Sequence, residues 1–478
     1  MKSFLRPLLL LTSAVSALTL SAQTPPPTDP TIAVNVPVLA LTHARVIDGL
    51  GHAPRENQTV VIRHGKIEAV GPDAEIKIPA DATVRDLTGK SVLPGLVLVH
   101  EHLFYSVFTP RAPFHVNEME YSFPRLYLAS GITSMRTGGS IEPYTDLQLK
   151  RRIDAGQVPG PKLHLTAPYL EGTPAAVAQL DSVDSPEAAT RTVNYWADEG
   201  FTSFKVYTHL STGVLTAVVA AAHQRHLQVT GHLGTISYRT AAETGIDNLE
   251  HGFFSMSDFI PGWKDNDQPN GMKAQRAFAA LDLDSPEVTG LIQLLVTKHV
   301  ALTSTLAILE TFNPGCRMMT PAELETLSAP ARDNYLANWA RVNAKKSGAE
   351  VIVWEHLLGL ENRFFRAGGL LVAGTDPTGY GGVIAGYGSW RTIELLVDAG
   401  LTSVEAIQVA TINGARLLGI DKETGSVEAG KAADLVVIAG NPAVDITDLR
   451  KTELVIKDGV GFDSTKLFDS VKGSVGIE

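Results

Sequence analysis

The chain has 478 residues, of which 44% are hydrophobic and 19% charged, so it can bury a large core and exceeds the usual size of a single domain. The net charge of −11 and the lack of a basic run argue against a nucleic-acid partner. A single cysteine, Cys316, excludes internal disulfides and a cysteine-cluster metal site.

Residues 1–22 are predicted to form an export signal that is cleaved after Ala22. Lys2 and Arg6 give it a positive start, "PLLLLTSAVSALTL" gives an apolar core, and "LSA" gives a cleavage site. The apolar part is short for a membrane span, and no cysteine follows it to carry a lipid. Residues 23–36, which include "QTPPPTDP", are predicted to be a proline-rich linker. We therefore expect an exported protein, periplasmic or secreted, with no membrane attachment after cleavage.

Both flanks of the remaining chain have a composition typical of β structure. Residues 37–90 contain short β-branched runs that are broken by Gly, Pro and Asp at turn positions. Residues 425–478, which begin "GSVEAGKAADLVVIAG", have the same pattern. The two flanks are predicted to form one small β-sandwich domain, with the middle of the chain inserted between them.

The middle of the chain, residues 91–424, alternates strands with helices, which predicts an α/β fold with a parallel sheet and right-handed crossovers. Residues 186–199 are predicted to form one of the helices, with Ser185 as N-cap and Gly200 just past the end. Residues 320–365 are predicted to be an inserted pair of helices. Eight candidate strands fit a (β/α)8 TIM barrel, namely "VLPGLVLVH", "ITSMRT", "KLHLTA", "SFKVYT", "LQVTGHL", "NLEHGF", "VALTSTL" and "GLLVAGTD".

Polar residues recur at the ends of these strands, where barrels of this kind carry their chemistry. In "HEH", His100 and His102 share one face of a strand and Glu101 faces the helices, because strand side chains alternate. Imidazole and carboxylate groups are the usual ligands of zinc and similar ions. Taken alone, each histidine is more readily explained as a hydrogen-bonded core or rim residue, so the prediction depends on the whole set. The candidate metal ligands are His100, His102, Lys205, His232, His251 and Asp376.

Lys205 needs a separate explanation, because an ammonium group cannot bind a metal ion. A buried lysine can lose its proton, and the neutral amine can then take up carbon dioxide to form a carbamate. That carbamate would act as a bridging carboxylate. The simpler alternative is a salt-bridged lysine at the rim, but the position of Lys205 between the HxH strand and the later histidines favours the carbamate.

Several motifs together resemble the amidohydrolase superfamily over nearly the whole mature chain. They are "VIDGLG", "VLPGLVLVHEH", "VAGTDP" and "ATINGARLLGIDKETGSVEAGKAADLVVI". Within the superfamily, "FKVY", "GHLG" and "LEHGFF" resemble the binuclear branch that includes prolidase-like, ochratoxinase-like and imidazolonepropionase-related enzymes. The resemblance implies two divalent ions, with zinc expected first. One ion would be held by His100, His102 and Asp376, the other by His232 and His251, and carboxylated Lys205 would bridge them.

One departure from relatives is Leu98, which stands where an aspartate often precedes the first histidine, so a polar contact behind the metal ligands is expected to be missing. Two metal ions would activate a water molecule, with Asp376 as proton acceptor and Tyr207 as a donor to the oxyanion. The expected substrate is a small amide, such as a dipeptide, an N-acyl amino acid or an ochratoxin-like aryl amide. The candidate contacts to a substrate carboxylate are Arg136, His164 and His209.

Three alternatives remain at this stage. A deaminase of the superfamily typically has a glutamate soon after the histidine of the fifth strand, and "GHLGTISYR" has none before Glu243. Imidazolonepropionase-like hydrolysis of a cyclic amide uses a similar rim of residues. The argument against it is the predicted export, because that hydrolysis is a catabolic step of the cytosol. A non-catalytic binding protein on the same fold would be expected to have lost a metal ligand. Relatives often assemble, so a homo-oligomer is a further expectation.

Overall fold

The computed structural model describes residues 29–107, 115–176, 180, 182–268, 271–345, 348–379 and 382–477. The predicted export signal and the start of the predicted linker therefore lie outside the described residues. Among the helices of these ranges, none is both long and apolar enough to span a bilayer.

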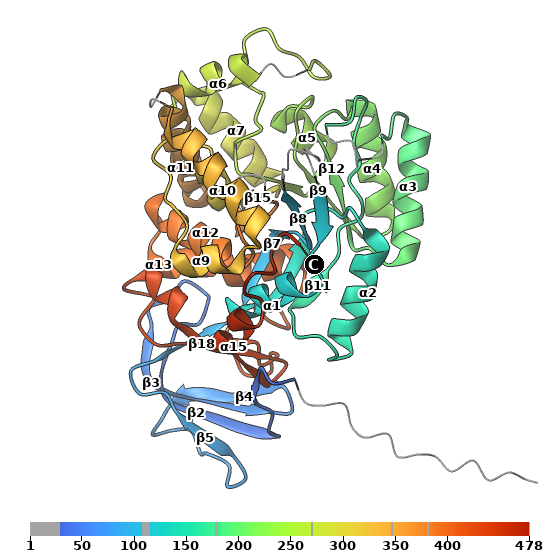
Figure 1. Ribbon diagram of the computed structural model, residues 1–478. Coiled ribbons are helices and arrows are strands. Elements are labelled where there is room, and N and C mark those ends of the chain that lie inside the picture. The colour runs from blue at the N-terminus through green and yellow to red at the C-terminus, as the bar shows by residue number, and fades with distance from the viewer. Residues whose placement is uncertain are drawn as a thin grey trace, which may run out of the picture.

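Both flanks of the chain contribute to one sheet, which lies below the parallel strands and their helices in Figure 1. Its order is β1-β19-β18-β17-β6-β2-β3-β4, and β5 pairs with β2 in addition. The antiparallel pairing of β17 with β6 joins the two flanks. The N-terminal strands are β1 (Ile32–Val34), β2 (Val38–Val46), β3 (Arg55–Arg63), β4 (Lys66–Pro72), β5 (Thr83–Asp86) and β6 (Ser91–Pro94). The C-terminal strands are β17 (Leu435–Ile438), β18 (Thr452–Lys457) and β19 (Val460–Asp463).

Two tight turns show how the sequence sets the pairing in this sheet. His64 and Gly65 connect β3 to β4, and Asp458 and Gly459 connect β18 to β19; all four residues have positive φ angles. A two-residue turn with both residues in this region matches the right-handed twist of the paired strands. The apolar side chains of both flanks then pack into one common cluster.

The edges of this end sheet differ from the predicted boundaries. β1 lies inside the predicted linker 23–36 and pairs with β19. β6 belongs to the end sheet, although residue 91 was predicted to open the barrel, because "VLPGLVLVH" is divided at Gly95 into two strands. The chain after β19 also leaves the sheet. Helix α15 (Ser464–Asp469) packs toward the barrel, and Val475 pairs with Leu327.

The middle of the chain contains parallel strands whose spatial order follows their order in the sequence. β7, β10 and β11 pair in parallel, and β12 to β16 form a second parallel group. A β-bridge between Thr166 and Ser203 joins the two groups. At the other end, the backbone N–H groups of Thr375 and Asp376 donate hydrogen bonds to the carbonyl of His100 in β7. The strands are β7 (Leu96–Glu101), β10 (Ile132–Thr137), β11 (Lys162–His164), β12 (Ser203–Val206), β13 (Gln228–Gly231), β14 (Asn248–Leu249), β15 (Ala301–Ser304) and β16 (Leu371–Ala373). A short hairpin of β8 (Phe104–Val107) and β9 (His115–Glu118) follows β7.

Helices cover the parallel strands (Figure 1). The prediction for α3 (Pro186–Glu199) is confirmed, because the Ser185 side chain accepts a hydrogen bond from the Ala188 N–H and Gly200 ends the helix with a φ of 103°. The others are α1 (Ser122–Ala129), α2 (Pro143–Asp154), α4 (Thr212–Gln224), α5 (Tyr238–Thr244), α6 (Gly271–Ala279), α7 (Pro286–Thr297), α8 (Leu306–Glu310), α12 (Tyr387–Asp398), α13 (Ser403–Gln408) and α14 (Gly414–Leu418). The chain also forms a π-helical turn (Val409–Asn413) and a 3₁₀ helix (Ile446–Lys451).

The segment before β16 contains three helices where a pair was predicted. They are α9 (Pro321–Thr326), α10 (Ala329–Asn343) and α11 (Ala349–Arg366). The additional helix, α9, begins with a capping box in which Thr320 and Glu323 each bond the backbone N–H of the other. Proline at the start of a short helix fixes its first turn, which the prediction overlooked.

Candidate metal centre

The six predicted ligand-type residues lie together at the ends of the parallel strands. His100 and His102 come from the end of β7, Lys205 from β12, and Asp376 from the turn after β16. His232 follows β13 and His251 follows β14. All six line one cavity of about 710 Å³.

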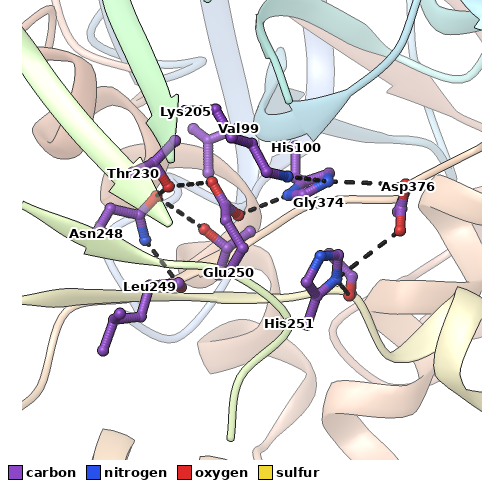
Figure 2. Close-up of polar contacts among 12 residues, drawn as sticks. Val99, His100, Lys205, Thr230, Asn248, Leu249, Glu250, His251, Gly374 and Asp376 are labelled. Carbon is purple, nitrogen blue, oxygen red and sulfur yellow. Dashed lines mark hydrogen bonds and ion pairs between the residues drawn. The ribbon is translucent and has the colours of Figure 1, made fainter. Parts of the chain in front are cut away.

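Asp376 contacts three of the histidines, and Figure 2 shows its contacts with His100 and His251. Its Oδ1 lies 3.0 Å from His102 Nε2 and 3.7 Å from His100 Nε2, and its Oδ2 lies 3.8 Å from His251 Nδ1. One ligand atom each from His100, His102 and Asp376 falls within 4.8 Å of the other two. This trio is therefore a candidate site for one metal ion.

The remaining members adjoin the trio. Lys205 Nζ lies 3.3 Å from His100 Nε2. The ring of His251 lies 4.7 Å from that of His100 and 4.4 Å from that of His232, measured between centroids. The histidines thus form a continuous row, with the lysine amine beside His100.

The local backbone accommodates this crowding at a conformational cost. His251 and Asp376 both have positive φ angles, of 64° and 55°, a region that residues other than glycine rarely adopt. At Gly374 and Gly138 any side chain would collide with His100. Strained residues of this kind gather at functional sites, where the surrounding structure holds them in place.

A buried ion pair fixes the far side of His100. Its Nδ1–H donates to Glu250 Oε2 at 2.6 Å, and Arg136 Nη2 donates to Glu250 Oε1 at 2.7 Å. Thr230 also donates to Glu250, and Arg136 Nε donates to the Val99 carbonyl at 2.9 Å (Figure 2). With Nδ1 protonated, the Nε2 lone pair of His100 points at the cluster.

Burial sets the protonation states of the cluster. It lowers the pKa of His102 to about 4 and that of His232 to about 3, and it also lowers the pKa of His251. Burial likewise lowers the pKa of Lys205 to about 8. For Asp376, burial acts in the opposite direction, but the bond from His102 and the nearby His100 hold the pKa of the carboxyl well below its usual value. His102, His232 and His251 are therefore neutral imidazoles near a carboxylate.

These groups fit a divalent metal ion. Neutral imidazole nitrogens and a carboxylate are the ligands that zinc and related ions prefer. His102 Nδ1 is buried and has no hydrogen-bond partner among the described residues, so the ring is not already committed at both nitrogens.

Sequence reasoning missed Glu250, although it stands next to His251 in "NLEHGF". A carboxylate in an otherwise apolar strand was the available signal, because a charged residue that is fully buried needs a partner. Glu101 lies, as predicted, away from the cavity, against Tyr127 of α1 and Thr375, and burial raises its pKa. Tyr207 lines the cavity, with its ring centroid 5.0 Å from that of His232.

The three predicted contacts to a substrate carboxylate are not placed for that role. Arg136 is 1% exposed, and its guanidinium is committed to Glu250 and Asn248 beneath the cluster. His164 lines a separate cavity of about 740 Å³ beside Lys162 and Lys457. His209 lies against Glu171, with Nδ1 3.6 Å from Oε2, and does not line the cavity of the cluster. All three residues lie at or just past strand ends, as predicted, but their side chains do not point into the cavity of the cluster.

Parallel strands with covering helices and a cluster of titratable groups at the strand ends define a hydrolase built on a TIM-barrel α/β fold. The model of the amidohydrolase family matches residues 91–461, so the chain belongs to the amidohydrolase family. It is a hydrolase that acts on C–N bonds.

Individual relatives differ in activity. Imidazolonepropionase of a Geobacillus species is 25% identical over 431 residues, which is 84% of this chain and 89% of that protein. A 5'-deoxyadenosine deaminase of Methanobrevibacter smithii is 41% identical, but only over 78 residues, or 16% of this chain and 18% of its own length. The crystal structure of a putative prolidase from Bifidobacterium longum superposes with a TM-score of 0.64 at 27% identity, covering 91% of this chain and 98% of that one.

Proposed function

We propose that the protein is an exported, metal-dependent amidohydrolase that cleaves an amide bond in a dipeptide, an N-acyl amino acid or an aryl amide. The observation that carries the proposal is the convergence of six ligand-type residues from five strands on one cavity. The likeness to the putative prolidase over nearly its whole length supports amide hydrolysis. The proposal includes a closed barrel of eight strands, a sandwich built from both chain ends, and export by the leading segment.

Two divalent ions, with zinc as first choice, would be held by His100, His102 and Asp376 and by His232 and His251. When bound, such ions lower the pKa of a water molecule and polarise a carbonyl group. Lys205 would bridge them as a carbamate. The lowered pKa of Lys205 supports this assignment, because only the neutral amine takes up carbon dioxide.

The chain's own residues would handle the proton. An oxygen of Asp376 accepts the proton of the attacking water and returns it to the nitrogen of the leaving amine. The hydroxyl of Tyr207 donates a hydrogen bond to the oxygen of the tetrahedral intermediate. Both residues line the cavity, as these roles require.

The test combines metal content with variants. Purified protein should contain close to two divalent ions per chain, and reversible chelation should abolish amide hydrolysis. Asp376→Asn keeps the size of the side chain but cannot take up a proton, so turnover should fall by about 10²- to 10⁴-fold. Lys205→Ala should lose metal and recover in part with acetate, whereas Lys205→Arg should not recover. Full activity with at most one ion, or in Lys205→Ala, would refute the binuclear, carbamate-bridged assignment.

A second candidate is the hydrolysis of a cyclic amide. It is favoured by the imidazolonepropionase likeness, which spans most of both chains. A panel that contains linear amides, a cyclic imidazolone and an aminopurine separates the candidates. Ammonia released from the aminopurine alone would favour deamination, and ring opening alone would favour the second candidate.

A further inference from the structure

The cavity in front of the histidine cluster is large and its outer wall is mostly apolar. Its volume of about 710 Å³ lies in the range of sites that enclose a drug-sized ligand. The wall is formed by Phe104, Ile141, Phe254, Ile308, Leu309 and Phe312. A ligand that reaches the cluster therefore meets mainly hydrocarbon and aromatic surface.

The charged side chains that line this cavity already contact other residues of the histidine cluster. Among the described lining residues, the side chains that carry charge are Lys205 and Asp376. Lys205 Nζ lies beside His100, and Asp376 contacts His102. Arg136, the residue expected to supply a cation, is bound to Glu250 below the cavity. The described wall thus offers no separate cation to a substrate carboxylate.

Two features of the wall suit an uncharged, apolar ligand. Phe254 is 45% exposed although it is a large aromatic residue, and a ligand in the cavity would cover it. Tyr169 and Tyr207 lie edge to face, with ring centroids 5.1 Å apart, and their hydroxyls have no hydrogen-bond partner among the described residues. Such hydroxyls donate to a neutral acceptor such as a carbonyl oxygen.

We propose that the substrate is an uncharged amide whose aromatic or branched aliphatic group fills this cavity, with no carboxylate next to the scissile bond. The inference rests on the proposed amide hydrolysis and narrows its substrate class. Burial of an apolar group against this wall is favourable, whereas burial of an unpaired carboxylate is costly. Among the candidate amides, aryl amides without a carboxylate are accordingly expected to be the best substrates, and dipeptides and N-acyl amino acids the poorest.

One adjoining hollow contains a cation and must be part of the test. It has a volume of about 430 Å³, shares Ile141 and Tyr169 with the main cavity, and includes Arg191. Arg191 does not line the cavity around the histidines. It therefore does not serve a carboxylate adjacent to the scissile bond, and Arg191→Ala should leave turnover unchanged.

The experiment compares two probes that differ by one group, N-acetylphenethylamine and N-acetylphenylalanine, with the full chain loaded with zinc. Both contain the same amide and ring, and only the second has the α-carboxylate. We expect kcat/KM to be at least about tenfold higher for the neutral amide. A preference for the acid, or a loss of acid hydrolysis in Arg191→Ala, would overturn the inference and leave amide hydrolysis intact.

Substitutions of wall residues test whether the preference for the neutral amide depends on the apolar wall. Phe312→Ala and Phe254→Ala should each raise KM for the neutral amide by about tenfold with a smaller effect on kcat. Met272→Ala is the control, because Met272 is 70% exposed on α6 and does not line the cavity. Equal effects of all three variants would overturn the inference.

If neither probe is cleaved, calorimetric binding separates the two proposals. Tighter binding of the neutral amide that is weakened in Phe312→Ala would support the apolar cavity and count against amide hydrolysis. Tighter binding of the acid, or no binding of either probe, would overturn the inference.

Discussion

Glu250 and Glu361 are glutamates that flank the turn bearing His251, and both are fully buried. Glu250, on the strand side, accepts hydrogen bonds from His100, Arg136 and Thr230. Glu361, on helix α11, packs against Gly252, with the Ser304 hydroxyl as its polar neighbour and no cation beside it among the described residues. Identical side chains at equal depth thus have opposite surroundings.

Their protonation states differ accordingly. Burial alone would raise the pKa of Glu250, but its neighbours His100 and the Arg136 guanidinium hold that pKa well below its usual value. With no cation beside it, burial raises the pKa of Glu361 to about 8. The comparison teaches that a partner cation, and not depth, decides whether a buried glutamate is a fixed negative charge or a neutral acid.

The largest effect is expected from removing the cation. Arg136→Met leaves Glu250 as an unpaired buried charge, which should lower the free energy of unfolding by about 3–5 kcal/mol. Denaturant unfolding measures this difference. As a control, Arg63→Met removes an ion pair with Glu68 near the surface and should have a far smaller effect. Equal losses in both variants would contradict the prediction, because they would show that burial of the charge left without a partner adds nothing to the cost.

Neutralising Glu250 should disturb the cluster more than the fold. In Glu250→Gln the carboxylate that fixes His100 is lost, so metal affinity or activity should fall by about 10- to 100-fold. Titration with zinc and a turnover assay measure it. Glu361→Gln is the matched control and should remain near wild type, because that side chain is already neutral at pH 7. Similar losses in both variants would contradict the assigned difference.

The pH dependence of stability should distinguish the same pair. Because the pKa of folded Glu361 is raised, its share of stability is present below its ordinary pKa and is lost as the pH rises through about 8. Glu361→Gln has no such loss, so the stability of the variant relative to wild type should increase by on the order of 3 kcal/mol between about pH 5 and pH 8. Parallel stability curves for the two proteins would refute the raised pKa.

A carboxylate near the surface gives the smallest effect. Glu405 pairs with Arg366 and closes the capping box of α13 with Thr402, and the bond from Arg366 lowers the pKa of Glu405 to about 2. Its contribution is therefore present at neutral pH and is lost as the pH falls toward 2. Glu405→Gln should cost about 1 kcal/mol at pH 7. The thermal midpoints of the two proteins should converge in acid, and a constant gap would contradict the assignment.

The ligand cluster could be predicted because strand ends meet at one edge whatever the loops between them do. "HEH", "FKVY" and "GHLG" each place a polar side chain just at the end of an apolar run, and that is enough to bring their residues together. The cap of α3 was equally readable, because Ser, Pro and Gly act through local backbone geometry.

Side-chain direction and partner choice could not be read from the sequence. Arg136 occupies a strand end, but its long side chain reaches beneath the cluster to Glu250, which is 114 positions away in sequence. That pairing depends on the relative position of two distant strands, and no local pattern encodes it. The assignment of β6 to the end sheet was missed for a related reason, since tertiary pairing divided a run that looked continuous. The extra helix α9 was missed for a different reason, because the local signal of its capping box and proline start was overlooked.

The pairing of β6 with β17 has a consequence for the order of folding. Every parallel strand of the barrel lies between these two partners in the sequence, so the end sheet cannot close until the barrel segment has been synthesised and brought its ends together. Closure of so long a segment carries a large entropic cost, and contacts of such wide sequence separation form slowly. Until then, the edge of β6 that will pair with β17 has no partner in the chain. A ribosome-bound intermediate that ends before β17 would present that edge to chaperones or to other chains.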